Sequence, residues 1–288
     1  MSRSTRGSIL PAIVFLGVTV LLAPMSPLHG QWVNAPGDGW IDFSTFYHDT
    51  RESYDHTGDR KEIFAAGHAR TLSAFMTLSA GLYRGVDVWA QVPVHHLRFD
   101  DLARDRTSTG LGDPKFFLRV GPELLGGPAF PIALRGGVKL AGGDFDVDAE
   151  IIPLGEGQRD YELMLERGHS LHPRSIWLAG WVGHRWRNPN LEARRRPGNE
   201  WFWYASVGGE WGQLDLQLAA EGVQSDAWII DGLFLETARR EMVQLLPRVG
   251  VDLRGGTIYG GARVPLRGRN LPAGTAINVG YFRTLSLW

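Results

Sequence analysis

Residues 86–95 read VDVWAQVPVH, and residues 115–120 read KFFLRV. In the first stretch every second residue, from Val86 to Val94, is valine or alanine; in the second, apolar residues alternate with Lys115 and Arg119. Because the pattern repeats every two residues, each set lies on one face of an extended strand. Soluble strands average about five or six residues, whereas a strand that crosses a membrane at a tilt needs about 9–11. The length of the first stretch therefore predicts a membrane-spanning strand whose apolar face contacts lipid and whose polar face points into a barrel.

The same alternation recurs along the whole chain and predicts about 12 strands, the even number that is typical of outer-membrane barrels. Their expected ranges are residues 39–49, 69–83, 86–95, 115–120, 131–140, 160–167, 175–186, 200–211, 214–221, 241–253, 257–266 and 275–288. The segments that connect these strands are alternately long and short, and the long ones are charged. We expect residues 98–109 to be one of the long loops. Outer-membrane barrels pair long outer loops with short periplasmic turns. The predicted fold is all-β: a transmembrane antiparallel up-and-down β-barrel of outer-membrane type, with both termini periplasmic.

The N-terminal residues 1–30 have the three-part layout of a secretory signal peptide. Arg3 and Arg6 precede an apolar run at residues 9–23, and residues 24–30 follow ahead of a polar, glycine-rich start. A membrane-anchoring helix is the alternative, but the run is short for a span of about 20 residues and contains Pro11. We therefore expect Sec-type export and cleavage near Gly30. The mature protein is then a single barrel domain, residues 31–288, in the outer membrane of a Gram-negative bacterium.

Composition excludes several other classes of protein. The chain has no cysteine, which rules out disulfide scaffolds and thiolate metal sites. Its net charge of -1 argues against a nucleic-acid partner, because such proteins carry a strong basic excess. His95 and His96 are adjacent and should point to opposite faces of a strand, so they do not form a shared metal site. We predict neither a metal nor a cofactor.

The polar faces of the predicted strands carry charges that we expect to line the lumen. The basic residues come from the fourth and fifth strands and the acidic residues from the sixth, eighth and ninth: Lys115, Arg119, Arg135 and Lys139, and Glu162, Glu166, Glu210, Asp215 and Glu221. A basic wall that faces an acidic wall would create a transverse field and orient dipolar solutes. The alternative is that these ions pair and fill the barrel, whose width lies between a filled eight-stranded and an open sixteen-stranded barrel.

Two segments resemble a known family. Residues 109–117 read TGLGDPKFF, and residues 131–144 read PIALRGGVKLAGGD. They are similar to segments of predicted outer-membrane proteins linked with the meta-cleavage pathway of phenol degradation, which are described as transporters. In that family a Gly-Leu-Gly-Asp turn opens a strand, and a later strand ends in a Lys-Leu-Pro-Thr-Gly-Asp-like segment. Ala141 and Gly142 stand where that pattern has proline and threonine. The resemblance implies the passage or binding of small molecules at the outer membrane.

The function that we expect is therefore passage or binding of small solutes, aromatic or dipolar, by a porin-like transporter that is not an enzyme. A closed structural or binding barrel is one alternative, and an outer-membrane lipid hydrolase is another. A hydrolase needs a nucleophile with a base in reach. His169 and Ser170 are adjacent in an expected turn, and no His-x-Ser-Asn pattern is present.

The expected partners follow from the predicted location. They are a small-molecule solute, outer-membrane lipids, lipopolysaccharide and the barrel-assembly machinery. The aromatic terminal residue Trp288 matches the terminal signal for that machinery only in part, because Leu285 and Leu287 lie on the other face of the strand. Arg194, Arg195 and Arg196 match the geometry of lipopolysaccharide phosphates, although an ordinary exposed loop would look the same.

Overall fold

The computed structural model describes residues 33–128, 130–142, 151–253 and 255–288. The expected signal peptide, residues 1–30, lies outside the described residues. In the described part of the chain no helix is long and apolar enough to cross a membrane.

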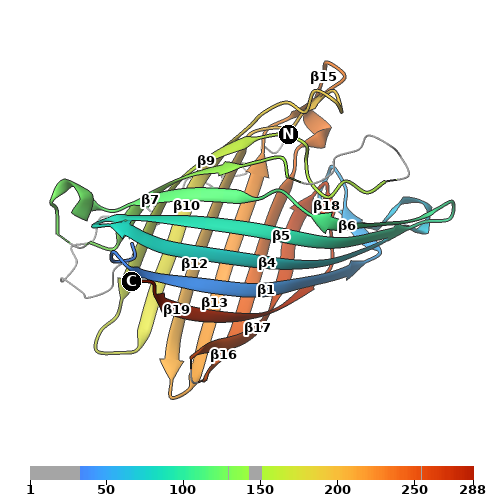
Figure 1. Ribbon diagram of the computed structural model, residues 1–288. Coiled ribbons are helices and arrows are strands. Elements are labelled where there is room, and N and C mark those ends of the chain that lie inside the picture. Colours follow the sequence, from blue (N-terminus) through green and yellow to red (C-terminus); the bar gives the residue numbers. More distant parts are fainter. Residues whose placement is uncertain (1–32, 129, 143–150, 254) are drawn as a thin grey trace, which may run out of the picture.

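One antiparallel sheet closes on itself to form a barrel (Figure 1). Its strands are β1 (Asp38–Thr50), β4 (His68–Tyr83), β5 (Val86–Asp100), β6 (Asp105–Leu111), β7 (Lys115–Val120), β8 (Ile132–Lys139), β9 (Asp160–Ser170), β10 (Ile176–Arg187), β12 (Glu200–Trp211), β13 (Leu214–Ser225), β16 (Glu241–Leu253), β17 (Gly256–Arg269) and β19 (Ala276–Ser286). Because β6 and β7 both pair with β5, these thirteen described strands occupy twelve positions. The predicted fold class and strand order are confirmed.

The two ends of the barrel differ. The terminal end, where β1 begins and β19 ends, has tight turns such as residues 84–85 and 212–213, in which Gly85 and Gly212 adopt φ of 72° and 66°. Positive φ is accessible to glycine at little cost. The opposite end, the loop end, carries two small sheets and two of the three short 3₁₀ helices. These elements are β2 (Glu52–Tyr54), β3 (Arg60–Glu62), β18 (Leu271–Pro272), β11 (Arg195–Arg196), β14 (Trp228–Ile230), β15 (Leu233–Leu235), η1 (Phe64–Ala66) and η3 (Glu236–Ala238), whereas η2 (Pro122–Leu125) lies at the terminal end.

The expected loop at residues 98–109 is wrong. β5 continues to Asp100, β6 returns from Asp105, and only residues 101–104 form the turn. The guanidinium of Arg98 pairs with Asp105 across the hairpin at 2.6 Å, and the Asp101 carboxylate accepts two backbone N–H groups in the turn. Charged side chains can pair across two strands outside the membrane, so the hairpin extends beyond the apolar part of the wall.

The outward face of the wall is apolar, as the alternation predicts. Leu134 and Leu216 are 49% and 37% exposed, so they lie on an outer surface and not in a closed core. Exposed aromatic side chains gather near both ends of the strands, where their amphipathic rings suit a membrane interface. At the terminal end these are Tyr83, Trp211 and Trp288, and towards the loop end Tyr47, Tyr161, Trp186 and Trp201.

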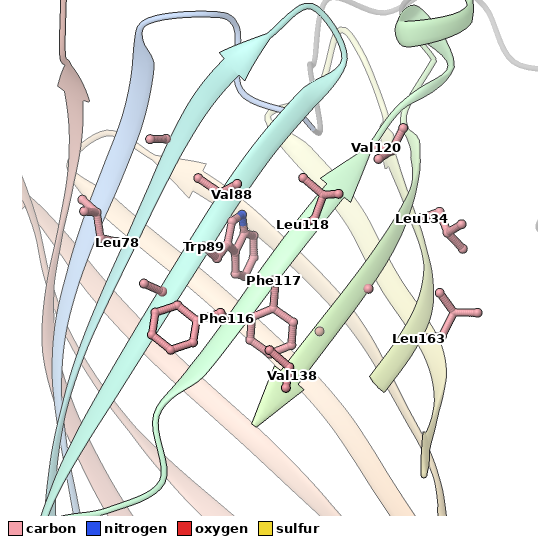
Figure 2. Close-up of a pocket in the computed structure, with 14 residues that line it drawn as sticks. Leu78, Val88, Trp89, Phe116, Phe117, Leu118, Val120, Leu134, Val138 and Leu163 are labelled. Carbon is pink, nitrogen blue, oxygen red and sulfur yellow. The ribbon is translucent and has the colours of Figure 1, made fainter. Parts of the chain in front are cut away.

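A hollow of about 720 Å³ interrupts the outer wall across β4, β5, β7, β8 and β9. Figure 2 shows large apolar side chains such as Leu118 and Leu163 around it. Small residues leave the space open, because a Cβ added at Gly136 would meet no atom within 4 Å. A Cβ added at the neighbouring Gly137 would instead clash with the ring of Phe117.

These two adjacent glycines therefore predict opposite effects of the same substitution. Gly136→Val should leave the free energy of unfolding unchanged or raise it by about 0.5–1 kcal/mol, since a valine fits an open strand position. Gly137→Val should lower it by about 1–3 kcal/mol through overpacking. Urea unfolding of the two variants in lipid vesicles measures both values. If Gly136→Val lowered the free energy of unfolding as much as Gly137→Val does, the space assigned beside Gly136 would be wrong.

Candidate functional site in the barrel interior

Two kinds of inner surface face the lumen. The charged wall consists of the inward side chains of β7 to β12 together with Asp87 of β5, and most of its polar side chains belong to acidic or basic residues. The neutral wall lies on β1, β4, β5 and β19, where the inward residues are uncharged apart from Asp42 and Asp87. The neutral wall is made of Ser44, Phe46, Ser73, Phe75, Thr77, Gln91 and Asn278.

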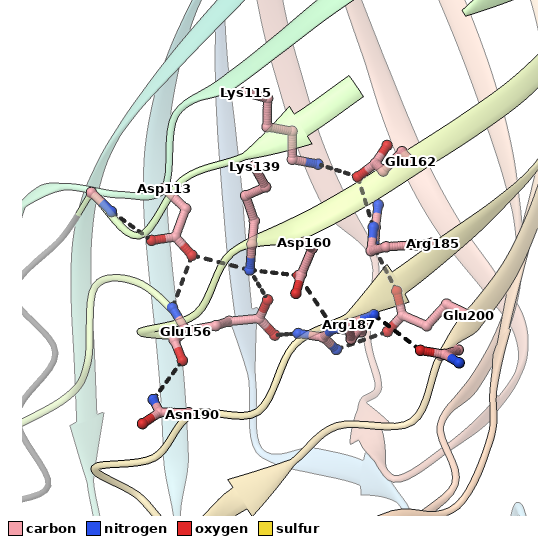
Figure 3. A network of polar contacts seen from close by, with 12 residues as sticks. Asp113, Lys115, Lys139, Glu156, Asp160, Glu162, Arg185, Arg187, Asn190 and Glu200 are labelled. Atoms are coloured by element: carbon pink, nitrogen blue, oxygen red, sulfur yellow. Dashed lines mark hydrogen bonds and ion pairs between the residues drawn. The ribbon is translucent and has the colours of Figure 1, made fainter. Parts of the chain in front are cut away.

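Towards the loop end, the charged wall contains a network of ion pairs that share their partners (Figure 3). The Lys139 ammonium lies 2.8 Å from Asp160 and 3.2 Å from Asp113, and it also pairs with Glu156. Arg187 completes the group: its guanidinium contacts Glu156, lies 3.3 Å from Asp160 and extends the network towards β12. Each cation therefore touches more than one carboxylate.

Two further layers follow towards the terminal end. In the middle, Arg185 bonds Glu162 at 2.7 Å and also pairs with Glu200, while Lys115 lies 3.8 Å from Glu162. Lower down, the pairs are Arg119 with Asp87 at 2.5 Å and Arg135 with Glu166 at 2.7 Å. Asp87 and Glu166 are 0% and 1% exposed. Arg135 also lies over the ring of Trp89, 4.4 Å from its centroid.

The expectation of a basic wall facing an acidic wall is wrong. β8, which carries Arg135 and Lys139, is directly paired with β9, which carries Glu162 and Glu166. Opposite charges on neighbouring strands meet on the same inner face. Removing an ion from water costs several kcal/mol, which close opposite charges offset. The positive and negative charges of the charged wall therefore cancel one another on one side of the lumen.

The remaining predicted lumen residues lie on or near β13. Asp215 bonds Arg248 of β16 at 2.6 Å, and Glu221 bonds Arg263 of β17 at 2.8 Å. Glu210 is exposed near the end of β12, beside the turn at the terminal end. Several members of the networks are not among the residues predicted from the sequence, although the alternation places those that lie on strands on the inner face. They are Asp87, Asp113, Glu156, Asp160, Arg185, Arg187, Glu200, Arg248 and Arg263.

Glu156 comes from a connection and not from a strand. Its backbone N–H donates to Asp113 at 2.9 Å, and the side chain of Asn190 donates to its carbonyl oxygen at 2.8 Å. Burial alone would raise the pKa of its carboxyl group, but the charges of Arg187 and Lys139 outweigh burial and hold that pKa well below the ordinary value. Glu156 thus ties the connection between β8 and β9 to the inner wall.

Open space remains beside the neutral wall. A cavity of about 400 Å³ is lined by Ser44, Thr45, Phe46, Ser73, Phe75, His95, Tyr259, Arg263 and Asn278. Several of its polar groups are held by the wall: the hydroxyl of Ser73 is 2.7 Å from Nδ1 of His95, and the Tyr259 hydroxyl donates to Asp42 at 2.7 Å.

The chain segment before β1 narrows the terminal end. The backbone N–H of Asn34 donates to Asp87 at 2.8 Å, and its side-chain amide donates to Ser79 at 2.6 Å. Val33 is buried beside it. Because Asp87 and Ser79 both point inward, residues 33 and 34 occupy part of the lumen there.

Other residues that the sequence singled out lie apart from the lumen network. His169 and Ser170 belong to the end of β9, not to a turn. Arg195 and Arg196 form β11 at the loop end, and the exposed Arg194 lies 3.2 Å from Asp231.

The histidine pair behaves as the strand alternation predicts. His95 contacts Ser73 of β4, whereas Nδ1 of His96 lies 2.6 Å from the Thr109 hydroxyl of β6 on the other face. In the described part of the chain no group of three or more histidine, aspartate or glutamate side chains is placed to hold a metal ion.

The fold has relatives among solved structures. The chain is similar to the COG4313 outer membrane channel from Pseudomonas putida F1, with 13% identity, a TM-score of 0.69, and coverage of 91% of this chain and 100% of that one. It is also similar to the beta domain of the Bordetella autotransporter BrkA, with 12% identity, a TM-score of 0.54, and coverage of 86% and 99%. No protein-family model matches the sequence, and no curated protein matches it. These structural similarities show that the chain has the fold of an outer-membrane barrel.

Removing the charge of a buried carboxylate should lower the free energy of unfolding far more than removing the charge of an exposed one. Asp87→Asn leaves the buried guanidinium of Arg119 without its nearest counter-ion and should lower the free energy of unfolding by about 3–5 kcal/mol. Asp105→Asn breaks the exposed pair with Arg98 and should cost about 0–1 kcal/mol. Denaturant unfolding monitored by tryptophan fluorescence compares the two. Equal losses would show that Asp87 contributes no more than a surface pair.

The lowered pKa of Glu156 fixes the sign of a pH dependence. A carboxyl group whose folded-state pKa is depressed stabilises the folded state above its unfolded pKa, about 4.3, and loses that contribution as pH falls through the folded value. The difference in unfolding free energy between wild type and Glu156→Gln should therefore be greatest at neutral pH and shrink in acid. A difference that grows as pH falls would contradict the assigned ion pairs.

Proposed function

We propose that this protein is an outer-membrane channel through which small uncharged or dipolar solutes pass along the neutral wall. The observation that carries the proposal is the division of the lumen. Charges on one side are neutralised by their neighbours, and the cavity lies beside the other side, against hydroxyl, amide and aromatic groups.

The paired charges bear on the kind of solute. An ion that enters the lumen must compete with contacts such as Arg135–Glu166 at 2.7 Å and Lys139–Asp160 at 2.8 Å. Those contacts are stronger than contacts in water because the local dielectric is low. A neutral solute disturbs none of them. Weak ion selectivity and slow passage of small neutral molecules are the expected properties.

The barrel width is consistent with a narrow path. Eight-stranded barrels are filled by side chains, and sixteen-stranded porins enclose a water channel. With twelve positions, the large inward side chains of the charged wall and the residues before β1 occupy part of the section. Only small molecules fit what remains beside the neutral wall.

The cellular setting is part of the same proposal. The fold and the fold relatives support a place in the outer membrane, reached after removal of a signal peptide from residues 1–30. The two segments that resemble the family linked with phenol degradation support a role in small-molecule uptake. We include lipopolysaccharide among the partners because Arg194 and Arg196 are exposed at the loop end, where its phosphates would lie.

Liposome swelling tests passage directly. Vesicles with the purified protein should admit small neutral solutes faster than empty vesicles do. Ser44→Trp places a large side chain in the cavity and should lower the swelling rate severalfold, because the path is narrow. Phe43→Trp, the neighbouring position on the lipid face, should swell at the wild-type rate and serves as the matched control.

The closed barrel is the second candidate, and a specific observation favours it. Residues 33 and 34 occupy the terminal end of the lumen and are hydrogen-bonded there. Swelling no faster than that of empty vesicles, together with no conductance in planar bilayers, would reject the channel and favour the closed barrel.

A further inference from the structure

We propose that the cavity beside the neutral wall is a binding site for one uncharged polyhydroxylated ring of monosaccharide size, a sugar or a cyclitol. This inference rests on the proposed function, because it names the solute class that the lumen would hold on its way through.

The neutral wall presents aromatic rings and hydroxyl groups in a checkerboard. On β1 and β4, Ser44 lies opposite Phe75, and Phe46 lies opposite Ser73. Directly opposed residues have Cβ atoms about 4.5–5.5 Å apart, and diagonal neighbours are about 7–8 Å apart. Each phenyl ring is therefore flanked by a hydroxyl within the width of one six-membered ring. A ligand with an apolar ring face and polar edges matches this pattern.

The number of polar groups favours many hydroxyls over one. Hydrogen-bonding side chains around the cavity are supplied by Ser44, Ser73, His95, Tyr259, Arg263 and Asn278. The side-chain amide of Asn278 has two donors and an acceptor, and none of them is engaged by a residue that the structure describes. Polar groups that lose water without gaining a partner cost free energy. Ser73, His95, Tyr259 and Arg263 already have a partner, but each keeps donor or acceptor capacity that a ligand can use. A ring with a single hydroxyl reaches few of these groups, whereas a polyhydroxylated ring bonds several at once.

The charges around the cavity argue against an ionic ligand. Arg263 is the cation of the lining, and it is bonded to Glu221 at 2.8 Å. The nearby Asp42 accepts a hydrogen bond from the Tyr259 hydroxyl. An incoming anion would meet the field of Glu221 and Asp42, and an incoming cation would meet the positive charge of Arg263. A neutral ligand avoids both costs and can still accept a hydrogen bond from the guanidinium.

The size of the cavity limits the ligand to one ring. Small-molecule sites commonly measure about 300–1,000 Å³. At about 400 Å³ this cavity lies near the lower limit of that range. It therefore accommodates a single six-membered ring with its substituents and a few water molecules.

Binding can be measured without transport. Saturation-transfer difference NMR on the full, detergent-solubilised protein should detect D-glucose or myo-inositol, with benzyl alcohol as the singly hydroxylated comparison. Phe46→Ala removes a stacking ring and Asn278→Ala removes the unengaged amide, and each should weaken binding about tenfold. Phe43→Ala and Ile277→Ala change lipid-facing residues on the same strands and should leave affinity unchanged. A heat-resistant β-sheet circular dichroism spectrum verifies that each variant is folded.

The outcomes separate this inference from the proposed function. Polyol binding that is lost in Phe46→Ala and Asn278→Ala but kept in both control variants supports the site, whether or not liposomes swell. Swelling by wild type with no polyol binding would overturn the site and leave the channel intact. Tighter binding of benzyl alcohol than of either polyol, or equal losses in the control variants, would also overturn it.

Discussion

The structure depends on one constraint: inside hydrocarbon, each backbone N–H and C=O must find its partner within the protein. An open sheet leaves two unpaired edges, and each unpaired group costs several kcal/mol. The pairing of β1 with β19 and of β4 with β5 completes the ring among the described strands. Closure then dictates the side-chain pattern, because alternate residues must face either acyl chains or the lumen.

Closure also explains the charges inside. Once the inner face is shielded, ions on it must be paired, and neighbouring strands are the nearest source of partners. The register of β8 with β9 brings Arg135 and Lys139 to the carboxylates of Glu166 and Asp160. In the same arrangement, the charges on one side of the lumen neutralise one another. The neutral wall keeps the open space, and both the proposed passage and the proposed polyol site belong to it.

The alternation of residues predicted the strands and their lipid-facing sides because that pattern is local. Val88, Leu134 and Leu216 could be assigned from two neighbours each. The pairing of ions could not, since it depends on which strands are adjacent and in which register. Arg185 and Arg187 were overlooked because the tryptophan-rich strand that carries them obscures the alternation. Glu156 lies in a connection, where no periodicity applies. The sequence of the β5–β6 hairpin resembles that of a loop because its side chains are charged on both faces.

The absence of cysteine from the sequence allows the central claim to be tested directly. Single cysteines at Leu134 and Leu216, and at Ser44 and Asn278, can carry a small fluorophore in vesicles containing brominated lipids. The account predicts that the acyl-chain bromines quench the fluorophore strongly in Leu134→Cys and Leu216→Cys and weakly in Ser44→Cys and Asn278→Cys. Equal quenching at all four positions, or the reverse order, would contradict a barrel with an apolar outer wall and a polar lumen.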